Sequence, residues 1–140
     1  MEASEKTRQE VLEILEKYRA GFLDQNVDLI LSLFDKGSGA TVISPERQDK
    51  IVGEEAIRSH YNRAKGESPS VRLEFKDMSV CEEGSVAWVS GNTYVRWITD
   101  DGKIDIALQF SGVLIHREGK WMIVQAHTSI PFESEPVPVE

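Results

Sequence analysis

The chain has 140 residues, of which 40% are hydrophobic and 29% charged, a balance typical of one globular domain with a single core. Its 16 basic and 24 acidic residues give a net charge of −8, and a field of that sign repels nucleic-acid phosphates and anionic lipids, so neither partner is expected. No apolar run approaches the ~20 residues of a membrane span, the N-terminus is not a secretory segment, and the single Cys81 cannot form an internal disulfide. A cytoplasmic location is therefore expected.

The first element is predicted to be an amphipathic helix from Thr7 to about Leu23. Thr7 and Glu10 fit a capping box at its start. One stripe of its surface is apolar at helical spacing, and it holds Val11, Ile14, Leu15, Tyr18 and Phe22.

Two further helices and a short strand follow. Asn26 is a suitable N-cap for a short helix that carries Leu29, Ile30, Leu33 and Phe34. The residues 40–43 form a short β-branched strand that Ser44 and Pro45 end. Gly53-Glu54-Glu55 opens a third helix, with its acidic residues where the helix dipole favours them.

From Val71 onward the hydrophobic pattern has the period of two that is typical of strands. Four strands are predicted near 71–81, 85–98, 103–116 and 120–130, joined by Gly-containing hairpin turns. Helices followed by an antiparallel meander indicate an α+β fold with the helices on one sheet face. Residues 1–131 are therefore predicted to form one domain, and the acidic, Pro-rich segment 132–140 a mobile tail.

The two faces of this sheet differ in polarity, and the pattern by itself allows two arrangements. One face is strongly apolar, whereas the other is mixed, with its polar groups near the strand ends. Either the helices cover the apolar face and the mixed face meets solvent, or the mixed face lines a cavity and the apolar one contacts a partner.

Several motifs, in this order, resemble the SnoaL-like and ketosteroid-isomerase-like proteins of the nuclear transport factor 2-like superfamily. They are Tyr18, Asn26-Val27-Asp28, Ala40-Thr41-Val42, Gly53-Glu54-Glu55-Ala56-Ile57, Tyr61, and the ending GKWMIVQAHTS over 119–129. This ending, with Tyr94-Val95-Arg96 upstream, is also similar to the association domain of calcium/calmodulin-dependent protein kinase II. The resemblance implies a cone-shaped, cystatin-like roll in which three N-terminal helices pack on a strongly curved antiparallel sheet.

The resemblance also selects the second arrangement of the sheet faces. It implies a small-molecule cavity lined by ligand-binding residues, which are Tyr18, Ser44, Tyr61, Asn92, Tyr94, Arg96, Gln109, Ser111 and Thr128. It further implies a homodimer through the opposite sheet face, formed by Val95, Trp97, Ile106, Leu108, Phe110, Ile123 and His127.

The isomerase reaction itself is not expected. It needs a carboxylate base beside a carbonyl and donors for the enolate oxygen. Tyr18 matches the family's oxyanion tyrosine and Tyr61 its supporting tyrosine, so these two remain candidate acids. Ser44 and Ser111 stand where the family has its two aspartates, and a serine without an adjacent base cannot abstract a carbon-bound proton.

Arg96 determines the expected ligand. A guanidinium inside a cavity needs a partner, which is either Asp105 on the neighbouring strand or an anionic group of a ligand. We therefore expect a small anionic or carbonyl-bearing ligand, and the substitution Arg96→Ala to abolish its binding.

The three histidines lack the spacing of a metal site, and no cofactor motif is present, so neither metal nor cofactor is expected. His60 neighbours Tyr61 and could reach the mouth of the pocket, but a solvent position is expected for it, and His127 is expected to face the partner subunit. The leading interpretation is thus a homodimeric ligand-binding domain. One alternative is a lyase, isomerase or hydratase that uses a pocket tyrosine as the acid with water or His60 assisting; another is a hub-like oligomerisation module.

Overall fold

The structure, a computed structural model, describes residues 1–37, 39–45, 50–67 and 71–131. The predicted tail, 132–140, lies outside the described residues. The helices are α1 (Glu5–Leu23), α2 (Val27–Ser32) and α3 (Glu54–Glu67). The strands are β1 (Thr41–Ile43), β2 (Ile51–Val52), β3 (Val71–Glu83), β4 (Val86–Thr99), β5 (Gly102–Arg117) and β6 (Lys120–Ser129).

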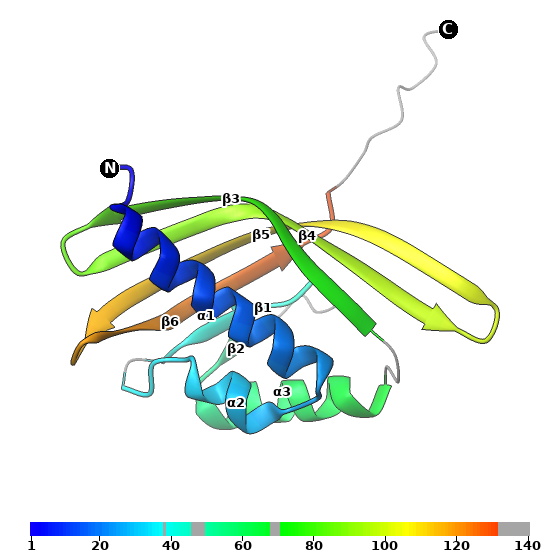
Figure 1. The fold of residues 1–140 in the computed structure, drawn as a ribbon. Coiled ribbons are helices and arrows are strands. Elements are labelled where there is room, and N and C mark those ends of the chain that lie inside the picture. The colour runs from blue at the N-terminus through cyan, green and yellow to red at the C-terminus, as the bar shows by residue number, and fades with distance from the viewer. Residues whose placement is uncertain (38, 46–49, 68–70, 132–140) are drawn as a thin grey trace, which may run out of the picture.

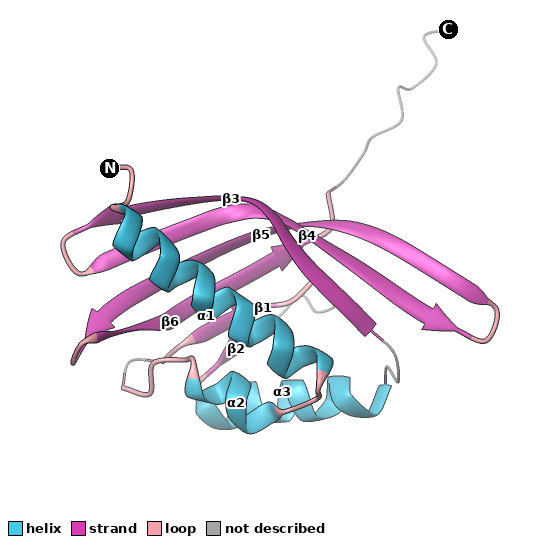
Figure 2. Ribbon diagram, viewed as in Figure 1, coloured by secondary structure: helices cyan, strands magenta, loops and turns pink. Residues whose placement is uncertain are grey.

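The predicted α+β architecture is confirmed. All three helices lie on one side of a curved six-stranded sheet (Figure 1), and the four long strands run side by side as the meander requires (Figure 2). The sheet order is β2-β1-β6-β5-β4-β3, so the sheet is open, with β2 and β3 at its edges. Two features were not predicted: the two-residue strand β2, and the parallel pairing of β1 with β6 in an otherwise antiparallel sheet.

The start of α1 differs from the prediction. Ser4, not Thr7, is the N-cap, and its hydroxyl accepts a hydrogen bond from the Thr7 amide at 3.1 Å. The Thr7 hydroxyl instead donates to the carboxylate of Glu82 on β3 at 2.9 Å. The predicted cap of α2 is confirmed, because the Asn26 side chain accepts from the Leu29 amide at 3.1 Å.

The helices cover the apolar face of the sheet, which is the first of the two arrangements that the pattern allowed. Leu108, Phe110 and Ile123 are buried on this face, in contact with or close to the helices. The predicted dimer interface is therefore wrong for six of its seven residues, which face the helices or the core: Val95, Trp97, Ile106, Leu108, Phe110 and Ile123. The hydrophobic effect explains the outcome for Leu108, Phe110 and Ile123, which the helices and the core bury within one chain. Val95, Trp97 and Ile106 point to the same side but are only half-buried.

A β-bulge in β3 bends the sheet over the helices. Asp77 has a positive φ of 58°, and the register between β3 and β4 shifts between Lys76 and Ser79. Gly91 of β4 faces this bulge, where a Cβ would lie 2.7 Å from Met78 Cε and 2.9 Å from the Asp77 carbonyl oxygen. The bulge and the glycine together let the long strands curve. In the described part of the chain no helix is long and apolar enough to cross a membrane.

Candidate functional site

A cavity of about 180 Å³ lies between the helices and the covered face of the sheet. Most of its wall is apolar and includes Phe22 from α1, Val42 from β1, and Phe75, Val95 and Phe110 from the long strands. Ligand pockets for drug-sized molecules are usually about 300–1,000 Å³. The cavity therefore suits a smaller molecule.

Two tyrosines from different helices meet in this cavity. The hydroxyl oxygens of Tyr18 on α1 and Tyr61 on α3 lie 2.6 Å apart and share a hydrogen bond. Their rings contact each other edge-on, and Phe75 of β3 touches the ring of Tyr18 with a centroid distance of 6.2 Å. The helical stripe of α1 positions Tyr18, and α3 brings Tyr61 across to it.

Burial keeps both phenols protonated. It raises the pKa of Tyr18 to about 12, although the hydrogen bond with Tyr61 lowers that pKa in part. Burial also raises the pKa of Tyr61 well above its ordinary value, helped by the neighbouring Tyr18. At neutral pH the pair is therefore a neutral hydrogen-bond donor and not a phenolate.

Four of the nine predicted site residues line this cavity. Besides the two tyrosines they are Ser44, after β1, and Thr128, near the end of β6. The sequence thus predicted correctly that Tyr18 and Tyr61 on the helices face the cavity, and that Thr128 lies on the cavity side of β6. Whether these residues bind a ligand stays a prediction.

The other five predicted residues lie on the opposite face of the sheet: Asn92, Tyr94, Arg96, Gln109 and Ser111. Their ladder partners show the parity, because Asn92 pairs with Gln109 and Arg96 with Asp105, while Thr93 and Val95 between them line the cavity. A strand reverses its face at every residue, so an alignment that is off by one position places the whole strand on the wrong face.

Arg96 pairs with Asp105, which was one of the two partners expected for it. Its Nε and Nη2 donate to the Asp105 carboxylate at 2.7 and 3.2 Å, and this hydrogen bond lowers the pKa of Asp105. The guanidinium is exposed and outside the cavity. The expectation that it holds an anionic ligand group inside the cavity is therefore wrong.

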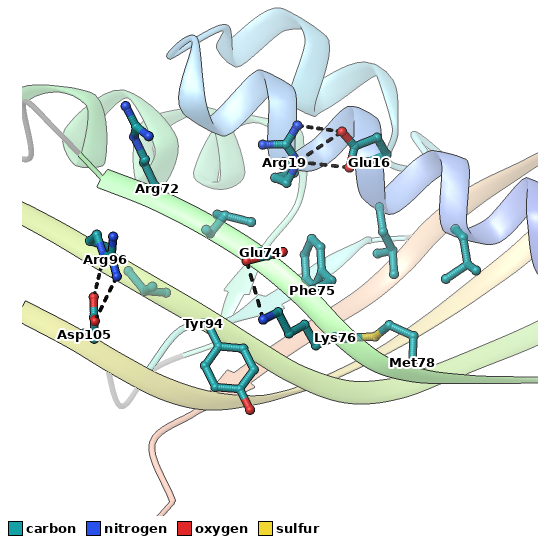
Figure 3. A pocket seen from close by; sticks show the side chains of 14 residues that line it. Glu16, Arg19, Arg72, Glu74, Phe75, Lys76, Met78, Tyr94, Arg96 and Asp105 are labelled. Carbon is teal, nitrogen blue, oxygen red and sulfur yellow. Dashed lines mark hydrogen bonds and ion pairs between the residues drawn. The ribbon is translucent and has the colours of Figure 1, made fainter.

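A larger hollow of about 830 Å³ runs along the edge strand β3, between α1 and the outer side of β4 (Figure 3). Six of its seven charged side chains form pairs: Arg19 with Glu16 at 2.6 Å, Lys76 with Glu74 at 3.9 Å, and Arg96 with Asp105 at 2.7 Å. The seventh is Arg72. Exposed pairs of this kind are well solvated and leave little demand for a ligand. The cavity with its tyrosine pair is the better candidate site.

The comparisons with known proteins agree with this fold. Residues 11–133 match the SnoaL-like domain family. The chain belongs to this family. No curated protein matches the chain.

Solved structures of similar fold share little sequence with this SnoaL-like domain. A candidate dehydratase of the nuclear transport factor 2-like family from Streptomyces avermitilis is 12% identical with a TM-score of 0.84, and the match covers 93% of this chain and 100% of that one. A candidate calcium/calmodulin-dependent protein kinase II association domain from Xanthomonas campestris is 17% identical with a TM-score of 0.79, covering 95% and 96%. A Catenulispora acidiphila protein solved in complex with S-DNPA is 16% identical with a TM-score of 0.81, covering 91% and 95%. These likenesses show the fold alone.

The two serines that were predicted to match the aspartates of ketosteroid isomerase lie on opposite faces of the sheet. Ser44 lines the cavity, whereas Ser111 pairs with His127 on the outer face of the sheet. His127 thus points away from the helices, on the sheet face that was predicted for it from its alternation with Thr128. Among the described residues, no group of three or more His, Cys, Asp or Glu side chains could hold a metal ion.

Sequence reasoning missed one polar residue of the cavity and favoured the wrong position for another. His60, expected at a solvent position, lines it beside Tyr61, and their ring centroids are 4.9 Å apart. Thr93, which was not considered, lies on the covered face of β4. A signal for Thr93 was available, because it interrupts the alternating apolar residues of that strand with a hydroxyl.

Proposed function

We propose that this SnoaL-like domain binds a small, uncharged, largely apolar molecule with a carbonyl oxygen in the cavity, and that the pair of Tyr18 and Tyr61 donates one hydrogen bond to this oxygen. The single observation that carries the proposal is the hydrogen bond in the cavity wall between the buried Tyr61 and the partly buried Tyr18. The SnoaL-like domains, to which the chain belongs, share a ligand-binding fold.

A count of protons explains why the pair needs an acceptor. Two neutral phenols carry two O–H donors, and one hydrogen bond between them uses only one of these. Within the described residues, the two hydroxyls make no hydrogen bond besides the one that joins them. The second proton is thus available for a ligand, and a carbonyl oxygen is a matching acceptor.

The wall of the cavity favours a neutral ligand. None of the described residues that line it is Asp, Glu, Lys or Arg. A carboxylate or phosphate would lose its hydration there without gaining a cation, which is costly. In an aromatic or aliphatic ketone, the carbonyl oxygen exchanges its hydrogen bond with water for one from the tyrosine pair, and the rest of the molecule is apolar.

Tyr18→Phe tests the proposal, with acetophenone as the probe and calorimetry or the fluorescence of Trp97, which lines the cavity, as the measurement. Loss of one hydrogen bond predicts about tenfold weaker binding than in the wild type. Tyr94→Phe is the matched control, since Tyr94 is 42% exposed on the outer face, and its affinity should not change. Equal affinity of the Tyr18 variant and the wild type, or no binding by the wild type, would contradict the proposal.

A second candidate is an acid–base enzyme, and the position of His60 favours it. His60 lines the cavity beside Tyr61, so an imidazole and a phenol could act on one ligand. In the dehydration of a β-hydroxy ketone, His60 would take the proton next to the carbonyl, Tyr18 would polarise the carbonyl oxygen, and the hydroxyl would leave as water with the proton that His60 returns. The Streptomyces avermitilis neighbour is a candidate dehydratase, which agrees with this chemistry.

The enzyme candidate predicts turnover of 4-hydroxy-4-phenylbutan-2-one to its unsaturated ketone, which is followed by ultraviolet absorbance. The rate should have a bell-shaped pH profile, and His60→Gln should lose turnover while still binding acetophenone. Binding of acetophenone by the wild type without any turnover would favour the purely binding function.

Homodimerisation and hub-like assembly stay proposals. The outer sheet face carries polar side chains instead of the expected apolar ones, including Asn92, Gln109 and Ser111. Static light scattering distinguishes a monomer, a dimer and a large ring, and only the ring would support the hub-like function.

A further inference from the structure

The covered face of β4 contains one polar side chain in an apolar row. From Val89 to Trp97 every second residue faces the helices, and Thr93 at the middle of the row is the only one with a hydroxyl. Its neighbours across the two ladders are Phe75 of β3 and Leu108 of β5. Thr93 is 4% exposed, and its hydroxyl has no hydrogen-bond partner in the described part of the chain.

This hydroxyl is unfavourable for the stability of the chain by itself. A buried hydroxyl without a partner loses its hydrogen bonds to water and receives nothing in return. Valine has almost the same shape and suits a strand interior as well as threonine does. Packing therefore gives no reason for threonine instead of valine at this position. A hydrogen-bond partner from outside the chain, such as a ligand, would give one.

Thr93 shares the cavity with the tyrosine pair. Its ladder partner Phe75 contacts the ring of Tyr18, and Thr93, Phe75 and Tyr18 all line the cavity. Rotation about χ1 exchanges the methyl and the hydroxyl of a threonine without moving the backbone. A molecule that fills the cavity therefore meets both Tyr18 and Thr93 in its wall.

We propose that Thr93 is a second polar contact of the bound ligand and selects molecules with two oxygens, a carbonyl at the tyrosine pair and a hydroxyl or second carbonyl at Thr93. This inference rests on the proposed function, because it needs a ligand in the same cavity. A hydroxylated aromatic ketone of about the size of hydroxyacetophenone has the required chemistry, with an apolar ring for Phe75 and Phe110.

The first test measures the stability of the free protein. Thr93→Val should raise the Tm by about 3 °C, because it removes an unpaired buried hydroxyl and keeps the volume. Thr7→Val is the matched control: Thr7 is 7% exposed, but its hydroxyl donates to Glu82, so this variant should lower the Tm. A Tm that falls in Thr93→Val would show that the hydroxyl has an internal partner and would overturn the proposal.

The second test measures calorimetric affinities for acetophenone and for its 2′-, 3′- and 4′-hydroxy derivatives. At least one derivative should bind the wild type about tenfold more tightly than acetophenone, and in Thr93→Val this derivative should bind no more tightly than acetophenone does to the same variant. Thr93→Ser, which keeps the hydroxyl, should retain the gain.

The outcomes separate the two proposals. If acetophenone binds and depends on Tyr18 but no hydroxyl derivative binds more tightly through Thr93, only the second polar contact is refuted. If the wild type binds none of the four ketones, the proposed function fails and this inference fails with it.

Discussion

The hydrogen bond between Tyr18 and Tyr61 should be measurable as a coupling energy in the free protein. The perturbation is a double-mutant cycle of Tyr18→Phe, Tyr61→Phe and the double variant. Tyr61 is only 5% exposed, so removal of its partner leaves a buried hydroxyl unpaired. Each single variant should lose about 1–3 kcal/mol of unfolding free energy, while the double variant, in which both hydroxyls are gone, should lose about 1 kcal/mol less than the sum.

Urea unfolding at pH 7, followed by circular dichroism and tryptophan fluorescence, measures the three free energies. An unchanged m-value ensures that the variants unfold from the same compact state. Tyr94→Phe is the control, because Tyr94 is exposed and its loss should change the free energy by less than about 0.5 kcal/mol. Additivity of the two single changes within about 0.5 kcal/mol would refute the reasoning, because it would mean that the two hydroxyls do not interact.

Three further predictions follow from the same geometry. Arg96→Ala should leave the affinity for acetophenone unchanged, because Arg96 lies outside the cavity and pairs with Asp105. A large loss of affinity would mean that Arg96 faces the cavity after all. The unfolding free energy should fall as the pH rises from about 10 to about 12. Burial raises the pKa of Tyr18 from 10.0 to about 12, so in this range the folded state holds a proton that the unfolded chain releases. Urea titrations at alkaline pH that show a constant unfolding free energy would contradict this. Gly91→Ala should lower the unfolding free energy by about 1–3 kcal/mol, because its methyl would meet backbone at the β3 bulge, whereas Gly37→Ala, with no contact shorter than 3.6 Å, should have little effect in the same urea assay.

Local patterns in the sequence determined the elements. The apolar stripe of α1, the Asn26 cap and the period of two after Val71 lie in neighbouring residues, and the structure has each of them within a few positions of its predicted bounds. The short strand β2 escaped prediction because two residues carry no periodicity, and its existence depends on pairing with β1. The start of α1 was misplaced because the role of Thr7 is set by Glu82, which is distant in sequence.

The tertiary structure decided which sheet face the helices cover, and thereby most of the site. The alternation along β4 and β5 was visible in the sequence, but both arrangements satisfied it, and a shift of one residue moves Arg96 from the cavity to solvent. The sequence did determine that Tyr18 and Tyr61 belong to apolar helix faces. Only the packed fold brings their hydroxyls to 2.6 Å and places the unpaired hydroxyl of Thr93 in the same cavity, because hydrogen bonds between distant segments depend on packing and not on local pattern.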